Sequence, residues 1–333
     1  MRKLISAITF LLTLAIIAGA GAGLWGLNEF RKPGPLAETR YVIVEKGTGM
    51  NGIAARLESE GAIASGMVFK IAARVKNQHT QLKAGEYEIA PQSSMAAILD
   101  KIVKGEVYDR KLTFREGLTS WQIVQMLNNA TELSGEALTS IPEEGSLLPE
   151  TYHYMKTDTR QNVIEQMQAA MKKAQDDLWP TRVPDLPVVN MSEVMVLASI
   201  VEKETGVPDE RRKVAGVFIN RLKRGMPLQS DPTAIYALTK GEIKDDGMGP
   251  LGRRLLRKDL EIDSPYNTYK YPGLPPGPIC NPGRESIAAV LNPETHNYVY
   301  FVADGTGGHV FAETLAEHES NVAKWRKIRA QGQ

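Results

Sequence analysis

The chain has 333 residues, of which 42% are hydrophobic and 24% are charged, and its formal net charge is +1. This length allows two or three domains with ordinary hydrophobic cores. The near-zero charge argues against a protein that binds nucleic acid through bulk electrostatics. The five histidines are scattered and the single cysteine is Cys280, so the sequence shows no cluster with metal-ligand spacing. We interpret Cys280 as structural, because no histidine partner is evident near it.

The first segment is predicted to be a transmembrane helix. Residues 4–27 are apolar and uncharged, and about 20 helical residues suffice to cross the core of a bilayer. Arg2 and Lys3 precede this run, so residues 1–3 are expected to stay in the cytoplasm while the bulk is exported. A cleaved signal peptide is the alternative, because Ala18–Ala20 resembles a small-residue cleavage site. The run is longer than a typical signal-peptide core, which favours the anchor.

The segments that follow alternate between strand and helix patterns, which predicts an α+β fold. Residues 28–40 are polar, contain two prolines and are expected to form a linker. Residues 41–110 are expected to form a small subdomain, and residues 111–333 a larger mixed α+β domain. The elements predicted for the subdomain are strands at 41–44 and 84–89 and helices at 50–57, 67–75 and 94–104.

A weak internal repeat connects the two expected domains. The copies share a strand, a glycine turn and two apolar residues at equal offsets, namely Val42–Gly47 with Ile53 and Leu57, and Leu112–Gly117 with Ile123 and Leu127. Two copies are too few for a solenoid, so the repeat indicates a duplicated strand–turn–helix unit. The first copy resembles the start of a LysM module, a small strand–helix–helix–strand fold that binds glycans. A generic α+β scaffold is the alternative.

The larger domain is predicted to be rich in helices and to end in a hairpin. Its predicted helices are at 162–178, 190–205, 208–224 and 231–237, and a polar loop is expected at 128–148. A strand at 297–303, a glycine-rich turn at 304–308 and a strand through Phe311 predict the hairpin, and a final helix runs through Arg329.

The predicted helix at 190–205 carries the most informative residue of the chain, Glu204. Glu204 falls on the same helix face as the apolar residues Val194, Leu197, Ile200 and Val201. Desolvation on that face would raise the pKa of the carboxyl, which suits a general acid near neutral pH. The alternative is a solvated side chain, as is usual for charged residues at a helix end. Glu202 points away from the centre of this face.

Polar residues beyond this helix are candidates to hold a ligand. Asn220 is expected to point inward from the next helix, either as a structural hydrogen bonder or as a substrate contact. Asp231 precedes Pro232, so a role as N-cap explains it without chemistry. Gln229 and Ser230 have no such local explanation.

Residues 263–283 form the most unusual stretch, because proline and glycine are dense there and Tyr266, Tyr269 and Tyr271 are interspersed. Long loops inside compact domains are usually functional. Tyrosine offers a flat apolar face and a hydroxyl, which suits sugar rings. We interpret the stretch as part of a binding groove, and a proline-stiffened surface cover is the alternative.

Six blocks in order resemble the YceG-like endolytic murein transglycosylases: Ala198–Thr205, Val217–Leu222, Leu228–Thr233, Tyr266–Tyr269, Gly273–Ile279 and Tyr300–Asp304. The resemblance implies a single-pass protein of the bacterial inner membrane with its bulk in the periplasm. It also implies a LysM-like subdomain at 41–110 and a catalytic domain at 111–333 that cuts peptidoglycan strands internally. One departure is Leu148, where an aromatic residue is expected, and this bears on one substrate contact rather than on the chemistry.

The resemblance places the catalytic glutamate at Glu204, with Glu202 as the alternative. The implied reaction is a non-hydrolytic cleavage between MurNAc and GlcNAc that leaves 1,6-anhydroMurNAc ends and needs no cofactor. The sequence offers no second acidic residue with equal evidence of burial, which fits a scheme with one carboxyl as acid and then base. The residues expected to hold the sugar are Asn220, Gln229, Ser230, Asp231, Tyr266, Asn267, Thr268 and Tyr269. Peptidoglycan synthases are possible further partners on the same resemblance.

Two other functions are weighed against this hypothesis. A pyridoxal-phosphate lyase of the aminodeoxychorismate type would need a Schiff-base lysine and a phosphate cradle. Lys203 is available, but it lies on the polar face of its helix and no phosphate loop precedes a helix. A non-catalytic glycan-binding scaffold of the wall-synthesis machinery would keep its function when Glu204 is replaced.

Overall fold

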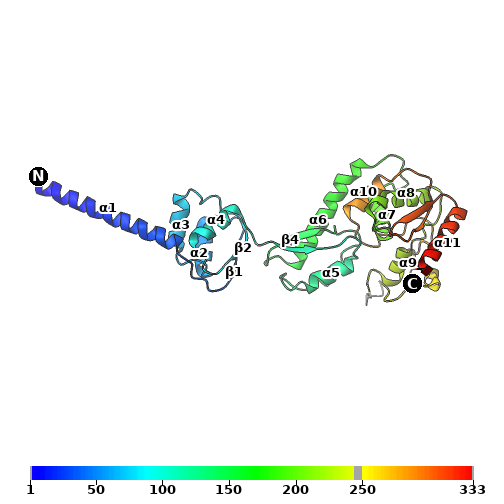
Figure 1. Cartoon of the computed structure of the whole chain (residues 1–333), viewed down its shortest axis with the longest axis horizontal. Coiled ribbons are helices and arrows are strands. Elements are labelled where there is room, and N and C mark those ends of the chain that lie inside the picture. Colours follow the sequence, from blue (N-terminus) through cyan, green and yellow to red (C-terminus); the bar gives the residue numbers. More distant parts are fainter. Residues whose placement is uncertain (1, 244–249, 332–333) are drawn as a thin grey trace. The chain divides into compact units, whose positions relative to one another are not determined.

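The computed structural model describes residues 2–243 and 250–331 and confirms the predicted α+β fold (Figure 1). The chain divides into two compact units, Met1–Arg110 and Lys111–Gln333. The elements of the first unit are α1 (Arg2–Arg31), β1 (Arg40–Val44), α2 (Met50–Ser59), α3 (Gly66–Val75), β2 (Gly85–Ile89) and α4 (Met95–Lys104). Apart from the end of α1, these elements lie within one or two residues of the predicted ones.

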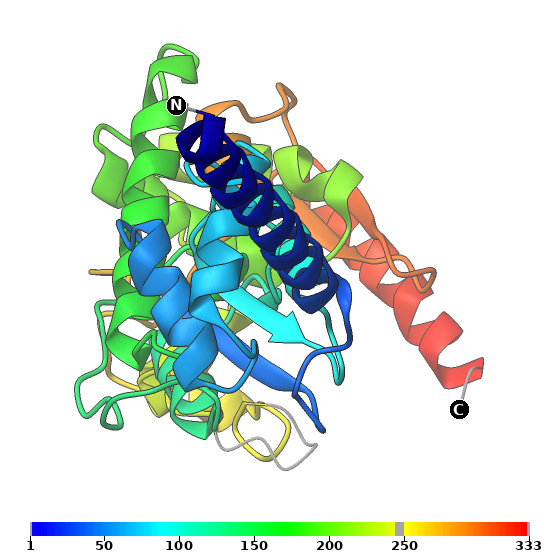
Figure 2. The same ribbon diagram turned by 90° about the vertical axis from the view of Figure 1, so that its left-hand side faces the viewer.

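The first unit is organised around the antiparallel pair of β1 and β2, the blue and cyan strands of Figure 2. In this pair Arg40 lies opposite Ile89 and Val44 lies opposite Gly85. The helices pack over the pair because each has an apolar side. The buried core includes Val42, Ile53, Leu57, Phe69, Tyr87, Ile98 and Leu99. The order β1–α2–α3–β2 is therefore strand–helix–helix–strand.

Helix α1 runs past its predicted end at Leu27, because no residue up to Arg31 breaks a helix and Pro33 comes only after it. Phe30 in its last turn is buried and belongs to the core of the first unit. The segment predicted as a linker, 28–40, therefore begins inside the helix. The portion Ile8–Arg31 is long and apolar enough to cross a membrane.

The second unit contains most of the helices and two short strand pairs, β3 with β4 and β5 with β6. Its elements are β3 (Arg110–Thr113), α5 (Ser120–Asn129), β4 (Thr151–Tyr154), α6 (Arg160–Leu178), α7 (Met191–Glu204), α8 (Arg211–Lys223), α9 (Asp231–Thr239), α10 (Arg284–Leu291), β5 (Tyr300–Ala303), β6 (His309–Ala312) and α11 (Leu315–Gln331). Short 3-10 helices lie at Trp179–Thr181, Pro208–Glu210 and Arg257–Glu261.

Helix α7 is the centre of the second unit. Residues 194–201 are all buried, as expected for a helix that is apolar on every side. Helices α8 and α10 pack against it and contribute to the same core. The Asn190 side chain caps its start by accepting a hydrogen bond from the amide of Glu193 at 2.9 Å. Glu204 therefore projects from the end of a helix that is fixed at its start and along its length.

The repeat predicted from the sequence has a structural counterpart in each unit. Gly47 and Gly117 both have positive φ angles, 84° and 77°, which glycine adopts without steric cost. The paired apolar residues after each turn are buried in their own cores, namely Ile53, Leu57, Ile123 and Leu127. A strand–turn–helix unit is thus present twice.

One local prediction is wrong in the second unit, and one strand was not predicted. Helix α9 begins at Asp231, and its N-cap is Ser230 rather than Asp231. The Asp231 carboxylate is therefore available for a contact outside its own helix. Strand β4 was not predicted, because its partner β3 is distant in the sequence and the pairing has no local signal.

Candidate active site

A pocket of ≈ 430 Å³ lies in the second unit at the end of α7. Its wall combines residues from helices, strands and loops that are far apart in the sequence. The lining residues are Glu204, Phe218, Arg221, Leu228, Gln229, Asp231, Tyr269, Tyr300, Phe301, Leu315 and His318. The pocket therefore unites predicted site residues with several that the sequence analysis did not single out.

Glu204 is partly buried in the wall of this pocket. Burial raises the pKa of its carboxyl to about 7, because the charged form loses hydration. The Ser230 hydroxyl donates a hydrogen bond of 2.5 Å to Oε1, which favours the carboxylate and moderates this rise. The negative charge of Asp231 acts in the other direction and raises the pKa further. Near neutral pH this carboxyl is populated in both protonation states.

Ser230 is held by a set of hydrogen bonds to Thr268. The Ser230 amide donates to Thr268 Oγ1 at 3.1 Å, and the Gln229 amide donates to the Thr268 carbonyl at 3.1 Å. The Thr233 and Thr268 hydroxyls lie 2.8 Å apart. Gln229 has a φ of 51°, a left-handed conformation that is unusual for a residue other than glycine. Such strained positions are typical of functional sites, and here the strain lies directly beside the partner of Glu204.

Asp231 and Tyr269 form the second polar contact of the pocket. The Tyr269 hydroxyl donates a hydrogen bond of 2.6 Å to Asp231 Oδ1. Burial raises the pKa of Tyr269, and the contact with Asp231 raises it further. The phenol is thus a fixed neutral donor that orients the carboxylate of Asp231.

Arg221 supports the pocket from α8. Its guanidinium donates to the Val299 carbonyl at 2.6 Å and to the Leu228 carbonyl at 2.8 Å, and it lies 5.4 Å from the centre of the Tyr300 ring. These bonds tie α8 to the strand region and to the segment that carries Ser230. Arg221 was not predicted, because its burial depends on contacts with Leu228 and Val299, which lie outside its helix.

The chain belongs to the YceG-like family. The family's profile matches residues 42–324. An endolytic murein transglycosylase of Bacillus subtilis (strain 168) is 32% identical over 346 residues, which cover 94% of this chain and 92% of that protein. One of Streptococcus pneumoniae serotype 2 (strain D39 / NCTC 7466) is 32% identical over 367 residues, 95% of this chain and 64% of that protein.

A solved structure of a yceG-like protein from Listeria monocytogenes is also similar to this YceG-like chain. It is 31% identical, covers 85% of this chain and 99% of its own, and superposes with a TM-score of 0.49.

The pocket brings together Gln229, Asp231 and Tyr269 of the residues predicted to hold a sugar, with Ser230 directly behind Glu204. Four other residues predicted to hold a sugar do not line the pocket: Asn220, Tyr266, Asn267 and Thr268. The Asn220 amide donates to the carbonyls of His296 at 2.7 Å and Tyr298 at 3.0 Å.

The remaining predicted residues have local partners in the long loop. The buried Asn267 amide donates to the carbonyls of Leu260 and Ile262 at 2.8 and 2.9 Å. The ring of Tyr266 packs against that of Tyr236, with centroids 4.9 Å apart. These contacts shape the loop from which Tyr269 reaches the pocket. Contact of these residues with a substrate stays a prediction.

Glu202 lies on another side of α7 and does not line the pocket. Its side chain is only 6% exposed, and its Oε2 accepts a hydrogen bond of 2.9 Å from the amide of Gly283. Arg211 lies 4.0 Å from its other oxygen. Glu202 therefore connects α7 to the start of α10. Its role is structural, unlike that of Glu204, whose side chain lines the pocket.

A second carboxyl with a strongly raised pKa corrects the expectation of a single buried acid. Burial raises the pKa of Glu144 to about 7. Its Oε1 accepts hydrogen bonds from the Ser120 amide at 2.7 Å and from the Asn281 side chain at 3.1 Å, and Tyr236 also contributes one. Glu144 is not among the residues that line the ≈ 430 Å³ pocket. The sequence gives no sign of it, because the residue lies in a polar loop.

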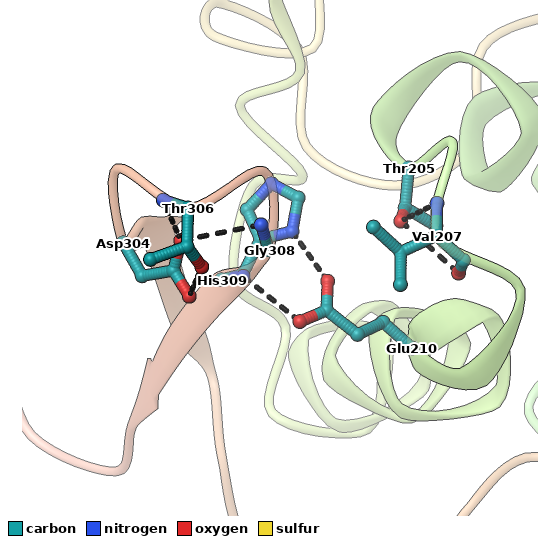
Figure 3. A network of polar contacts seen from close by, with 7 residues as sticks. All are labelled: Thr205, Val207, Glu210, Asp304, Thr306, Gly308 and His309. Carbon is teal, nitrogen blue, oxygen red and sulfur yellow. Dashed lines mark hydrogen bonds and ion pairs between the residues drawn. The ribbon is translucent and has the colours of Figure 1, made fainter.

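A network at the start of β6 fixes the strands beside the end of α7 (Figure 3). His309 Nδ1 lies 2.7 Å from Glu210 Oε2, and the His309 amide donates to Glu210 Oε1 at 2.8 Å. Asp304 Oδ1 accepts from the amides of Thr306 at 2.7 Å and Gly308 at 3.2 Å, which closes the hairpin turn. The hairpin that carries Tyr300 is thereby anchored to the start of α8.

The C-terminal helix α11 completes the pocket. His318 stacks on the ring of Tyr300, with centroids 5.0 Å apart and an interplanar angle of 21°. Burial lowers the pKa of His318, and the positive charge of Arg221 lowers it further. His318 is thus a neutral aromatic wall of the pocket at neutral pH. Its role depends on the packing of α11 against β5, which no local sequence pattern reports.

Proposed function

We propose that this chain is a membrane-anchored endolytic murein transglycosylase that cleaves the MurNAc–GlcNAc bond, with Glu204 as its catalytic carboxyl. The relatives from Bacillus subtilis and Streptococcus pneumoniae carry the name of this activity and align with 94% and 95% of the chain. The observation that carries the assignment of the residue is a carboxyl in a pocket wall whose pKa is raised by burial to about 7.

One carboxyl suffices for the proposed reaction. Protonated Glu204 donates its proton to the glycosidic oxygen as the bond from MurNAc C1 breaks. The resulting carboxylate accepts the proton of the MurNAc C6 hydroxyl, whose oxygen bonds to C1 and closes the 1,6-anhydro ring. No water is consumed, and the carboxyl ends in its starting protonation state. A group with a pKa near the working pH can perform both proton transfers.

Asp231 and the aromatic residues of the pocket are proposed to bind the sugar and to stabilise the charge that develops on it. The carboxylate of Asp231, oriented by Tyr269, places a negative charge in the pocket where positive charge develops at C1. Gln229 offers an amide for hydrogen bonds, and the stacked rings of Tyr300 and His318 offer an aromatic wall against which the sugar can pack. Two-carboxylate glycosidases use the second group as nucleophile or as base for water, and here the C6 hydroxyl replaces both.

The proposed location is the bacterial inner membrane, with α1 as a single-pass anchor and the second unit in the periplasm. Two observations support it. Ile8–Arg31 is long and apolar enough to span a bilayer, and the positive residues Arg2 and Lys3 precede it. Peptidoglycan synthases remain proposed partners on family grounds.

The test is the product chemistry of the Glu204→Gln variant. Intact sacculi digested by the parent chain should release fragments with 1,6-anhydroMurNAc ends, which mass spectrometry identifies. Glu204→Gln should abolish them, while Glu202→Gln should release them normally because its amide oxygen can still accept from Gly283. Fragments with free reducing ends would instead identify a hydrolase. Full function of Glu204→Gln in cells would identify a non-catalytic scaffold.

A further inference from the structure

Helix α3 carries an apolar stripe on the side that faces away from the core. Met67, Ile71 and Val75 repeat at four-residue intervals and share one side of the helix, and all three are exposed, Val75 by 81%. The other side, with Phe69 and Ala73, is buried in the core of the first unit. We call Met67, Ile71 and Val75 the α3 stripe. Contiguous exposed apolar surface of this kind marks a contact with a membrane or a partner.

The α3 stripe borders a groove that α3 shares with the end of α1, where the two helices lie side by side in Figure 1. The groove encloses ≈ 480 Å³, and α1 lines it with residues from Ala22 to Phe30. Trp25 is one of these residues and is exposed. Tryptophan is enriched at the interface between membrane and water. The apolar surfaces of the proposed anchor and of α3 are therefore continuous.

The position of the groove along α1 defines a depth in the bilayer. From Ala22 to Leu27, the end of the uncharged run, a helix rises about 7.5 Å at 1.5 Å per residue. A helix that lies in the membrane interface buries its apolar face by about 5–10 Å. If α1 spans the bilayer, α3 lies at the depth at which such helices are found.

The charges around the stripe fit a lipid surface. Lys70 and Arg74 lie on α3 beside the stripe, and the sequence Gly66–Val75 contains no acidic residue. Arg31 and Lys32 follow at the end of α1, where Lys32 pairs with Glu29 at 2.7 Å. Basic residues that flank an apolar face favour anionic headgroups. A lipid bilayer matches both features, because its acyl chains can fill the apolar groove and its anionic headgroups can contact the basic residues beside it.

We propose that the α3 stripe inserts into the membrane surface beside α1 and that lipid acyl chains fill the groove between the two helices. This proposal rests on the proposed membrane anchoring by α1. The first unit is then held against the bilayer by two elements, the spanning helix and α3, and its orientation to the membrane is fixed.

The test measures lipid contact in the full-length protein. The chain is reconstituted into bilayers whose acyl chains carry bromine, and a bimane fluorophore is attached at Val75→Cys. Leu14→Cys, inside the proposed span, reports anchoring, and Met67→Cys tests the stripe a second time. Val107→Cys is the matched control, because it is a valine of the same unit, 45% exposed, that packs at Gly85 on β2. The parent chain, with its buried Cys280, gives the background labelling.

Bimane at Val75 and Met67 should lose fluorescence to the brominated lipid, as bimane at Leu14 does, and bimane at Val107 should lose none. Quenching at Leu14 with none at Val75 and Met67 would overturn the proposal and leave the anchor intact. No quenching at Leu14 would overturn the anchor and the proposal together. A disulfide between two chains through Val75→Cys, without quenching, would show a second copy on the stripe and would also overturn the proposal.

Discussion

Glu204 and Glu144 have the same raised pKa and different surroundings. Burial raises the pKa of both carboxyls from 4.5 to about 7. Glu204 accepts from a neutral hydroxyl, that of Ser230, and lines a pocket of ≈ 430 Å³. Glu144 accepts from a backbone amide and from Asn281 and links the start of α5 to the loop before α10.

The difference shows that a raised pKa does not identify a catalytic acid on its own. Perturbed carboxyls occur both in active sites and in structural networks. Glu204 and Glu144 differ in two respects, namely whether the carboxyl lines a pocket and how many hydrogen-bond donors hold it. If these differences separate a catalytic carboxyl from a structural one, substitutions at the two carboxyls have different effects.

Glu204→Gln should lower transglycosylase activity by about 10²–10⁴-fold, because the amide cannot transfer a proton. Glu144→Gln should keep the activity of the parent within about twofold, since Glu144 lies outside the pocket. The rate of release of anhydro-muropeptides from sacculi measures both. Equal losses in the two variants would contradict the separation.

Glu144→Gln should flatten the dependence of stability on pH. The pKa of Glu144 is higher in the folded chain, so between pH 4.5 and 7 the folded state binds more protons than the unfolded state. The free energy of unfolding therefore decreases as pH rises through this window, by up to about 3 kcal/mol for this one carboxyl.

Thermal unfolding of the full chain in detergent at pH 5 and pH 8 measures this effect. The parent should lose stability between the two values, and Glu144→Gln should lose less. Glu204→Gln should likewise lose less stability than the parent between pH 5 and pH 8, because the pKa of the Glu204 carboxyl is raised to the same value. If the melting temperature of Glu144→Gln falls between pH 5 and pH 8 as steeply as that of the parent, burial of Glu144 is not the source of the pH dependence of stability.

Ser230→Ala should shift the pH profile of activity to higher pH. The Ser230 hydroxyl stabilises the carboxylate of Glu204, so its loss raises the pKa further. The activity of an acid catalyst falls as pH rises through its pKa. In Ser230→Ala this fall should occur at a pH higher by about one unit. Ser120→Ala, next to Glu144, is the control and should leave the profile in place. A shift to lower pH would refute the role of Ser230.

Tyr269→Phe should have the smallest effect. It removes the hydroxyl that donates to Asp231 at 2.6 Å and retains the ring. One hydrogen bond of this kind contributes about 1 kcal/mol, which predicts a loss of about fivefold in kcat/KM. Tyr271→Phe is matched, because its hydroxyl donates to Asp263 outside the pocket, and it should be neutral. Equal effects in both would point to a general change in the loop.

The sequence predicts well those features that depend on neighbours within a few residues. The predicted face with Val194, Leu197 and Ile200 is buried, but residues 194–201 are buried on every side, so periodicity indicates the direction of Glu204 and not the full burial of α7. The glycine turns of the repeat follow from the freedom of glycine at positive φ. The approximate position of the site on α7 was thus available before the fold.

The parts that the sequence does not predict are contacts between distant elements. Arg221 and His318 line the pocket through the packing of α8, β5 and α11, and Glu144 is buried by segments far from it in the sequence. The N-cap of α9 lies at Ser230 rather than Asp231, and the Asp231 carboxylate accepts a hydrogen bond from Tyr269, a residue distant in the sequence. Tertiary packing here overrides the local preference.

The burial of Cys280 has a consequence for the proposed export of this chain to an oxidising compartment. The Sγ atom donates to the Ser199 carbonyl at 3.3 Å, and burial raises the pKa of the thiol well above its usual value. The reactive thiolate is therefore scarce, and Cys280 is expected to react slowly with oxidants. Cys280 is the single cysteine of the sequence, so no disulfide can form within this chain and the fold depends on its packed cores.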